Sequence, residues 1–322
     1  MTALTTSSAD AFRHEALFYG GEAQFVDGTA SFIRGGLAAG EPVLAVVSAE
    51  KIRALRDELD RDAGDVCFAD MADVGRNPAR IIPAWRAFVD LHGGSRRLRG
   101  IGEPIWDGRS RAELAECQRH EALLNVAFEG SGPWWLLCPY DTDALDPDVL
   151  EEAERTHPFV ARRGTHRTSS VCRDLDTMAA PFDAPLPDPP VQPLELAFDE
   201  HDLPALRRVV FEQADRAGLD VRRAADLVLA VHELAVNSIR HGGGRGAVRV
   251  WPDGDALVYE VADAGHIVEP LVGRLQPTPD QLDGRGLWLV NQLCDLVQLR
   301  SYPTGTVVRI HASRHRHPTS PG

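Results

Sequence analysis

Short apolar runs alternate with longer amphipathic segments over the first half of the chain. Runs of four or five apolar residues are typical of strands buried on both faces, and segments of helical periodicity between them are typical of crossover helices. The expected strands are residues 43–47, 66–69, 98–101 and 134–138, and the expected helices are residues 50–62, 78–91, 111–128 and 147–156. This order predicts an α/β fold with a mainly parallel sheet.

Six prolines interrupt the pattern between Arg173 and Pro193. Proline breaks helices and favours extended backbone, so this segment is expected to be an interdomain linker. The expected organisation is a flexible N-terminus (1–12), a first domain (13–172), the linker (173–193), a second domain (194–313) and a tail (314–322).

The pattern changes after the linker. Helices are expected at 204–217, 222–240 and 287–296, and strands at 247–251, 257–262, 297–302 and 306–312. Turn residues at 252–255 and 303–305 separate neighbouring strands, as hairpins require. The second domain is therefore expected to be an α+β sandwich with a largely antiparallel sheet.

Composition narrows the possible functions. A chain of 322 residues with 43% hydrophobic and 25% charged content is long enough for two folded domains. Its net charge of −14 argues against binding nucleic acid or an anionic membrane through a basic field. Lys51 is the only lysine and has no glycine before it and no hydroxyl after it, which excludes a P-loop. A kinase of the eukaryotic type and a pyridoxal enzyme would also have to depend on Lys51.

The five cysteines are scattered without a CxxC pair, and residues 1–10 contain no basic region leading into an apolar one. Apolar stretches are much shorter than the roughly 20 residues that a membrane helix needs. We therefore expect a cytoplasmic protein with reduced thiols and no membrane span.

Three motifs in the second domain carry candidate chemistry. Glu233, Asn237 and His241 follow at i, i+4 and i+8, so they share one face of a largely apolar helix. A carboxylate and an amide set among apolar residues need a partner, and a metal-bound nucleotide would supply one. Asp263 and Gly265 end an expected strand, where an acid followed by glycine lets a planar ligand approach the backbone.

The third motif is Gly284-Arg285-Gly286, which opens the helix at Leu287. Free N–H groups and the positive end of a helix favour a phosphate there. Each motif has an ordinary alternative, such as a solvated helix face or a simple turn. Their order, followed by Gly305-Thr306 at the last strand, favours a nucleotide site.

These motifs resemble the GHKL ATP-binding family over residues 194–313, and within it the anti-sigma-factor serine kinases. Glu233 to His241 resembles the N box, Asp263 to Gly265 the G1 box, and Gly284 to Leu287 the G2 box. The resemblance implies a Bergerat sandwich that binds ATP and Mg²⁺. The resemblance implies that Glu233 acts as a general base and that Asn237 ligates Mg²⁺. It implies that Asp263 accepts a hydrogen bond from the adenine amine and that Thr306 supports this contact. The residues of the G2 box would contact the phosphates (Gly284, Arg285, Gly286 and Leu287).

The sequence departs from this family at Ile267, which replaces the second glycine of the common Asp-x-Gly-x-Gly pattern. The segment between the boxes, 266–283, is too short for a chaperone-like lid. No phosphoacceptor-histidine helix pair precedes the domain, which favours the anti-sigma branch over a sensor histidine kinase.

The first domain resembles the MEDS sensory domain, which is similar to RecA-like and Rossmann-like folds without the P-loop. The resemblance covers residues 13–171 and is carried by His14 to Tyr19, Gly40 to Val43, Gly102 to Trp106, His120-Glu121 and Cys138 to Asp141. Asp70, Glu103 and Asp141 follow expected strand ends, where open α/β sheets bind ligands, and form the candidate sensory site. Such acids also cap helices. His14 and Tyr19 are expected to be structural.

Together these observations predict a cytoplasmic signalling regulator whose GHKL domain binds Mg-ATP and phosphorylates a serine on an anti-sigma-factor antagonist or related partner. Two alternatives stay open: a catalytically silent ATP-binding module that sequesters its partner, and a histidine-kinase-related ATPase. The expected partners are a sigma factor or its antagonist, with an unknown small-molecule signal at the first domain and no direct nucleic acid or membrane. The family resemblance also implies a homodimer. His311, His315 and His317 are expected in a solvated tail rather than at a metal.

Overall fold

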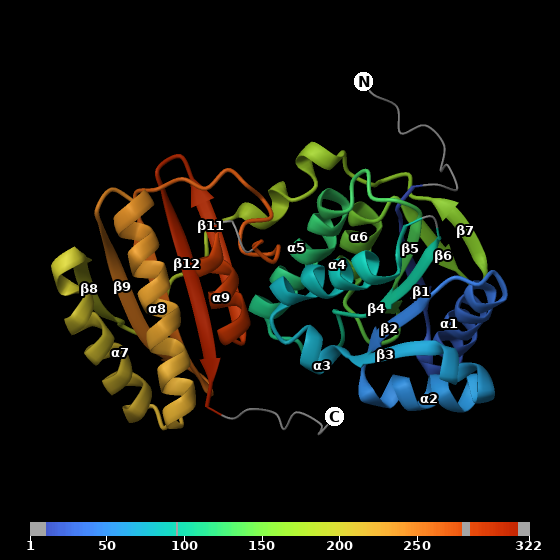
Figure 1. Cartoon of the computed structure of the whole chain (residues 1–322), viewed down its shortest axis with the longest axis horizontal. Coiled ribbons are helices and arrows are strands. Elements are labelled where there is room, and N and C mark those ends of the chain that lie inside the picture. Colours follow the sequence, from blue (N-terminus) through green and yellow to red (C-terminus); the bar gives the residue numbers. More distant parts are fainter. Residues whose placement is uncertain (1–10, 95, 279–283, 315–322) are drawn as a thin grey trace. The chain divides into compact units, whose positions relative to one another are not determined.

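The computed structural model describes residues 11–94, 96–278 and 284–314 (Figure 1). The chain forms two compact units, Met1–Phe182 and Asp183–Gly322. Most of the expected flexible N-terminus and of the tail, including His315 and His317, lies outside the described residues. Over the described ranges, no helix combines the length and the apolar character needed to cross a membrane.

The first unit is built on a seven-stranded sheet of order β3-β2-β4-β5-β1-β6-β7. Its strands run parallel except for β7, which pairs antiparallel with β6. The mainly parallel α/β fold is thus confirmed. The strands are β1 (Arg13–Tyr19), β2 (Val43–Val47), β3 (Val66–Asp70), β4 (Leu98–Gly102), β5 (Trp134–Asp141), β6 (Phe159–Arg162) and β7 (Thr165–Thr168).

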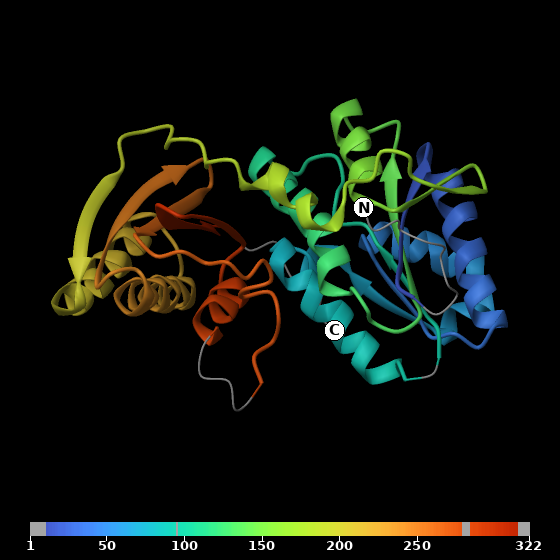
Figure 2. The same ribbon diagram turned by 90° about the horizontal axis from the view of Figure 1, so that it is seen from above.

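Helices cover both faces of this sheet (Figure 2). Leu17 and Tyr19 of β1 pack in a core with Phe25 and Ile33 of α1 on one face, while the helices α4, α5 and α6 lie on the opposite face (Figure 1). The helices are α1 (Gly21–Ala38), α2 (Ala49–Leu59), α3 (Met71–Val74), α4 (Ile81–His92), α5 (Arg111–Ala127) and α6 (Pro147–Thr156), with 3₁₀ helices at Asp60–Asp65, Pro78–Arg80, Leu175–Thr177 and Ala180–Asp183.

The apolar pattern does not predict several elements of this unit, among them the short helix α3. β1 contains His14 and Glu15, which interrupt its apolar run, although both side chains are buried. The pattern also does not predict the helix α1 and the β6–β7 hairpin. The hairpin turns at Arg163 and Gly164 with φ values of 49° and 74°, as a two-residue turn of the primed type requires.

The segment expected as a linker packs on folded structure over much of its length. Met178 and Phe182 are buried in a small core with Ala122 of α5, so residues up to 182 belong to the first unit. In the second unit, Tyr302 Oη donates to the Asp183 carbonyl at 2.7 Å and Arg309 Nη2 donates to the Pro187 carbonyl at 2.8 Å. Proline removes a backbone donor but leaves every carbonyl free to accept.

The second unit has a five-stranded antiparallel sheet of order β11-β12-β10-β9-β8, with its helices packed on one face (Figure 2). This confirms the expected α+β sandwich. The strands are β8 (Leu194–Asp199), β9 (Arg245–Asp253), β10 (Ala256–Asp263), β11 (Leu296–Tyr302) and β12 (Gly305–Ser313); the helices are α7 (Leu203–Arg216), α8 (Val221–His241) and α9 (Arg285–Leu293), with a 3₁₀ helix at Glu200–Asp202. The edge strand β8 is not predicted from the sequence.

Alternation along β10 decides which side chains meet the helices. Leu257, Tyr259 and Val261 are buried in the core beneath the helices. Because side chains alternate across a strand, Asp263 continues this row on the helix side. On the other face, Glu260 is 1% exposed and accepts hydrogen bonds from Arg309 and Arg249.

Candidate functional site

The helix α8 brings the first motif to the pocket. It begins where the Asp220 side chain accepts a hydrogen bond from the Arg223 backbone N–H at 2.9 Å, a favourable N-cap. Its stripe of Glu233, Asn237 and His241 lies at the border of the buried face. Glu233 and Asn237 are half-buried, and His241 is exposed at the last turn.

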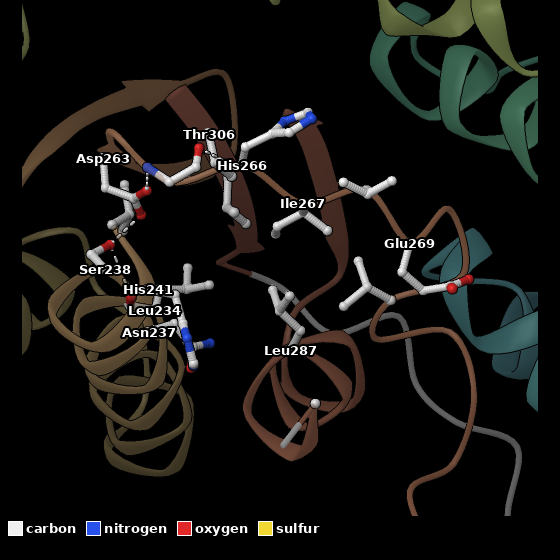
Figure 3. Close-up of a pocket in the computed structure, with 16 residues that line it drawn as sticks. Leu234, Asn237, Ser238, His241, Asp263, His266, Ile267, Glu269, Leu287 and Thr306 are labelled. Carbon is white, nitrogen blue, oxygen red and sulfur yellow. Dashed lines mark hydrogen bonds between the residues drawn. The ribbon is translucent and has the colours of Figure 1, made fainter. Parts of the chain in front are cut away.

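Asp263 lies on the floor of the site, at the end of β10 (Figure 3). Its Oδ2 accepts from the Ser238 hydroxyl at 2.6 Å, and its Oδ1 accepts from the Gly265 backbone N–H at 2.7 Å. The strand register sets Asp263 directly opposite Thr306 of β12. These contacts fix the carboxylate and leave each oxygen a lone pair for a further donor.

Two glycines make this close packing possible. A Cβ atom on Gly242 would lie 2.4 Å from Asp263 Cγ, and one on Gly265 would lie 2.8 Å from the His241 carbonyl oxygen. Such contacts would force the end of α8 away from β10. Gly265 is therefore required by space beside the end of α8, a reason that differs from the approach of a planar ligand expected from the sequence. Gly242 is expected from the sequence to cap α8, and the structure adds its close packing on Asp263.

A chain of hydrogen bonds holds the loop after β10. The Thr306 hydroxyl donates to the Gly265 carbonyl at 2.8 Å, and the Ser301 hydroxyl lies 2.8 Å from Thr306 Oγ1. The Ile267 backbone N–H donates to Ser301 Oγ at 2.7 Å. Thr306 thus holds the loop that carries Gly265, the residue whose N–H binds Asp263.

The third motif meets the first at the start of α9. Gly284 caps this helix with a φ of 83°, a conformation that favours glycine. A Cβ atom on Gly286 would lie 2.9 Å from Glu233 Oε2 and 3.1 Å from Asn237 Nδ2. The first turn of α9 therefore adjoins Glu233 and Asn237 of α8. The N–H groups of this turn have no acceptor within the helix.

A cavity of about 320 Å³ lies between these elements (Figure 3). Seven of the predicted residues line it: Asn237, His241, Asp263, Gly265, Gly284, Leu287 and Thr306. Glu233, Arg285 and Gly286 lie beside it without lining it. Residues to which the sequence analysis assigns no role also contribute, above all Ser238 and the apolar wall of Leu234, Val261, Ile267, Val272 and Val308. Ser238 had one signal, its position beside Asn237 on the same helix.

This arrangement suits a ligand with an apolar planar part and an anionic part. Apolar walls would cover a ring, and the Asp263 carboxylate at their base would accept from an N–H of that ring. The start of α9 offers backbone donors to an anion. Asn237 offers an amide oxygen, the type of ligand that Mg²⁺ prefers.

In the first unit, Glu103 is held by an ion pair with the only lysine. Lys51 Nζ lies 2.6 Å and 2.7 Å from the two carboxylate oxygens of Glu103, and Tyr19 Oη donates to Glu103 at 2.7 Å. Burial raises the pKa of Glu103 above its usual range despite the opposing effect of Lys51. Burial, followed by the charge of Glu103, also raises the pKa of Tyr19. Lys51 therefore neutralises a buried carboxylate at the position where sequence reasoning expects a ligand.

The other two sensory candidates are separated. Asp70 Oδ1 caps α3 by accepting from the Ala72 N–H at 2.9 Å, and Asp141 Oδ1 accepts from the Asp143 N–H at 3.0 Å. β3 is an edge strand, three places from β5, so Asp70 and Asp141 lie on strands about 14 Å apart. Glu103 follows β4, and Asp141 ends the neighbouring strand β5. The structure brings these two together and leaves Asp70 apart.

A second cavity of about 320 Å³ opens beyond the carboxyl ends of β1, β5 and β6. Phe18 and Tyr19 of the first MEDS motif contribute to its lining. The sequence motifs do not indicate the other lining residues, which are Gly20, Gln24, Thr142, Asp143, Arg162 and Arg163. Arg162 and Arg163 belong to the β6–β7 hairpin, which has no helical or strand signature in the sequence. Their contribution to a site could not be predicted without the fold.

Comparison with known proteins assigns both units. Residues 13–158 match the family model of the MEDS domain, the methanogen/methylotroph, DcmR sensory domain. Residues 196–312 match that of the histidine kinase-like ATPase domain. The chain thus carries a MEDS domain followed by a histidine kinase-like ATPase domain. This confirms the resemblances to the MEDS and GHKL families and makes the second unit a GHKL-type ATP-binding signalling module.

Solved structures include distant matches. One is the RsbU and RsbW domains of Rv1364c from Mycobacterium tuberculosis, with 21% identity and a TM-score of 0.31 over 39% of this chain and 34% of that chain. Another is the histidine kinase AdeS of Acinetobacter baumannii, with 17% identity and a TM-score of 0.25 over 39% of this chain and 70% of that chain. This chain therefore spans about a third of the first. No curated protein matches the chain.

Proposed function

We propose that the second unit binds Mg-ATP and transfers its γ-phosphoryl group to a serine of a protein partner, an anti-sigma-factor antagonist or a related regulator. One observation carries this proposal. Asn237 of α8, Asp263 of β10, Thr306 of β12 and Gly284 at the start of α9 line a single cavity, although they lie far apart in the sequence. Their placement supports an adenine end and a phosphate end within one site.

At the adenine end, Asp263 accepts a hydrogen bond from the exocyclic amine. The Ser238 hydroxyl and the Gly265 N–H hold its carboxylate in place, so recognition requires no movement of the side chain. The apolar wall that includes Leu234, Ile267 and Val308 covers the ring faces. A guanine presents a carbonyl where adenine presents an amine, and two acceptors facing each other would disfavour it.

At the phosphate end, Asn237 binds Mg²⁺ through its amide oxygen, and the start of α9 donates backbone N–H groups to phosphate oxygens. Bound Mg²⁺ would neutralise charge on the transferred group. The close approach of Gly286 to Glu233 supports a position for that carboxylate beside the phosphates. Glu233 accepts the proton of the attacking serine hydroxyl as a general base.

The first unit acts as the sensor in this proposal. Its fold has no phosphate-binding lysine, because Lys51 is paired with Glu103. The cavity beyond β1, β5 and β6 supports a small-molecule signal at the carboxyl edge of the sheet, where open α/β sheets bind ligands. Arg162 and Arg163 favour a signal that carries an acidic group.

A transfer assay with labelled ATP and purified candidate partners tests the kinase. Wild-type protein is expected to label a serine of one partner, and Asn237→Ala is expected to weaken Mg²⁺-dependent ATP binding measured by calorimetry. Gln213→Ala, which removes a half-buried amide of α7 that does not line the cavity, is the control. ATP binding that is equal in wild-type protein and Asn237→Ala would remove Asn237 from the metal site.

Ile267 favours a second candidate, a catalytically silent module that binds ATP and sequesters its partner. Its side chain lines the cavity where the common pattern has glycine, and its N–H is held by Ser301, so the loop is fixed. A fixed loop suits constant binding better than turnover. This module would be favoured over the kinase if the protein binds a partner only with ATP and no candidate partner acquires a phosphoserine.

A further inference from the structure

A buried cluster of potential metal ligands lies in the first unit, away from both cavities. His14 of β1, Glu121 of α5, Cys138 of β5 and His157 after α6 each offer one ligand atom, and these atoms all lie within 4.8 Å of one another. All four side chains are at most 1% exposed. The four residues come from separate segments, and the order β5-β1-β6 in the sheet brings them together.

The distances within this cluster suit a tetrahedral ion. His14 Nε2 lies 3.1 Å from Glu121 Oε2 and 3.3 Å from Cys138 Sγ, and His157 Nε2 lies 3.2 Å from Glu121 Oε2. Zinc bonds of about 2.0–2.3 Å place neighbouring ligand atoms about 3.3–3.7 Å apart in a tetrahedron. Small side-chain adjustments would therefore bring the four atoms to a common ion.

Hydrogen bonds on the far side of each ring set the histidine tautomers. His157 Nδ1 lies 2.8 Å from the Ala153 carbonyl, which can only accept, so Nδ1 carries the proton. His14 Nδ1 lies 3.1 Å from Asn125 Oδ1, and the amide nitrogen of Asn125 donates to the Thr156 carbonyl at 2.9 Å. Both neutral rings thus present the lone pair of Nε2 to the cluster, the arrangement of metal-ligating histidines.

Some polar atoms of the cluster have no hydrogen-bond partner in the protein. Among the described residues, Glu121 Oε1 and His157 Nε2 are buried without a hydrogen-bond partner. His157 Nε2 is near Glu121 Oε2 but is not aligned for a hydrogen bond to it. A carboxylate facing two imidazole lone pairs places acceptors against acceptors, which costs energy in a buried site unless a cation lies between them.

We propose that His14, Glu121, Cys138 and His157 form a buried site for a divalent transition-metal ion of the Zn²⁺ type. A carboxylate and a thiolate balance the two charges of the ion, and two neutral imidazoles complete a mixed set of nitrogen, oxygen and sulfur ligands that Zn²⁺ accepts. The two neutral rings would ligate through Nε2, and the ion would displace the proton of the Cys138 thiol on binding.

The site differs from the proposed nucleotide site in residues, unit and ligand chemistry, so the two proposals fail independently. Its place under the centre of the parallel sheet indicates that metal enters during folding rather than through an open channel. The ion would join β1, β5, α5 and α6, the elements on which the unit is built.

The test uses the full chain produced in medium that contains Co²⁺ as the probe in place of Zn²⁺. Wild-type protein is expected to contain one Co²⁺ per chain by elemental analysis and to show thiolate-to-Co²⁺ charge-transfer absorption. Cys138→Ser is expected to lose that absorption. Cys67→Ser, an exposed cysteine outside the cluster, is the matched control and is expected to retain the spectrum of the wild type.

A second variant tests the positioning role of Asn125. Asn125→Ala is expected to keep the ligands but weaken Co²⁺ affinity about 10–100-fold, measured by competition with a chelator. Folded wild-type protein that contains no Co²⁺ overturns the proposal. A thiolate-to-Co²⁺ band that persists in folded Cys138→Ser also overturns it, because another cysteine would then supply the sulfur ligand.

Discussion

The two units place their charged groups at strand ends in opposite ways. In the first unit, the carboxylate that follows β4, Glu103, is buried against Lys51 and Tyr19. In the second unit, the carboxylate that ends β10, Asp263, is held by one hydroxyl and one backbone N–H at the floor of a cavity. A carboxylate neutralised by an ammonium group supports the fold, whereas one held by neutral donors keeps its charge available to a ligand.

This contrast teaches that an acid at a strand end is a weak indicator of a ligand site. The same sequence feature gives a helix cap at Asp70, a buried ion pair at Glu103 and a cavity floor at Asp263. The neighbours decide the role. The glycines at 242 and 265 leave space beside Asp263, while Lys51 and Tyr19 fill the space beside Glu103.

The largest expected effect is on phosphotransfer. Glu233→Ala is expected to lower the rate of transfer about 10²–10⁴-fold, because a general base acts on the transition state. ATP affinity should stay within a few fold, since the ground state gains little from this carboxylate. Single-turnover transfer and calorimetry measure the two quantities. Glu212→Ala, on the exposed face of α7, is the control, and equal transfer by Glu233→Ala and wild type would exclude Glu233 as the base.

Breaking the ion pair of the first unit should affect stability rather than nucleotide binding. Lys51→Met is expected to lower the free energy of unfolding of the first unit by about 3–5 kcal/mol, because it leaves the buried Glu103 carboxylate without its cation. Denaturant titration measures this loss, and ATP affinity should be unchanged. Arg34→Met, which breaks a half-exposed ion pair with Glu58, should cost at most about 1 kcal/mol.

The Lys51→Met loss should also depend on pH. Burial raises the pKa of Glu103 in the folded state above the ordinary value of 4.5, and removal of Lys51 raises it further. A raised folded-state pKa means that the folded protein binds a proton more readily, so the loss is largest above that pKa and decreases as the pH falls towards 4.5. A loss that is constant from neutral to acidic pH would contradict the role of Glu103.

A smaller effect is expected on base recognition. Asp263→Asn keeps the shape of the side chain but replaces one acceptor oxygen with a donor, and should weaken ATP binding by about 1.5–3 kcal/mol, the contribution of a hydrogen bond to a charged group. The preference for ATP over GTP should disappear. Asp253→Asn, at the exposed end of β9, is the control. Retained preference in Asp263→Asn would show that another residue reads the base.

The smallest expected effect is the ATPase activity of the first unit. A chain ending at Phe182, which keeps the buried Met178 and Phe182, should show no hydrolysis above background, because its only lysine neutralises Glu103. Phosphate release measures this, with residues 183–322 as the parallel sample for ATP binding. ATP hydrolysis by the first unit alone would contradict the assignment of nucleotide chemistry to the second unit only.

If a small ligand binds the first unit, the effect of ATP on that ligand in the full chain must equal the effect of the ligand on ATP. Identical ligand affinity with and without ATP would show that the two units bind independently.

Local patterns in the sequence determined much of the second unit. The apolar periodicity of α8 and the alternation along β10 place Asn237 and Asp263 on facing surfaces, because both depend only on residues near in the chain. The glycine motif before α9 also indicates its site directly, since Gly284 begins the helix with a positive φ. Family resemblance could therefore be found from these short segments.

Only the tertiary structure decided the remaining features. β1 is inserted between β5 and β6, which brings His14, Cys138 and His157 together although more than a hundred residues separate the first from the other two. Likewise, Lys51 and Glu103 pair because β2 and β4 are neighbours in the sheet, which separates Asp70 from Asp141. Local patterns report which face a residue occupies, whereas the order of strands, set by packing of the whole core, decides which distant residues share a site.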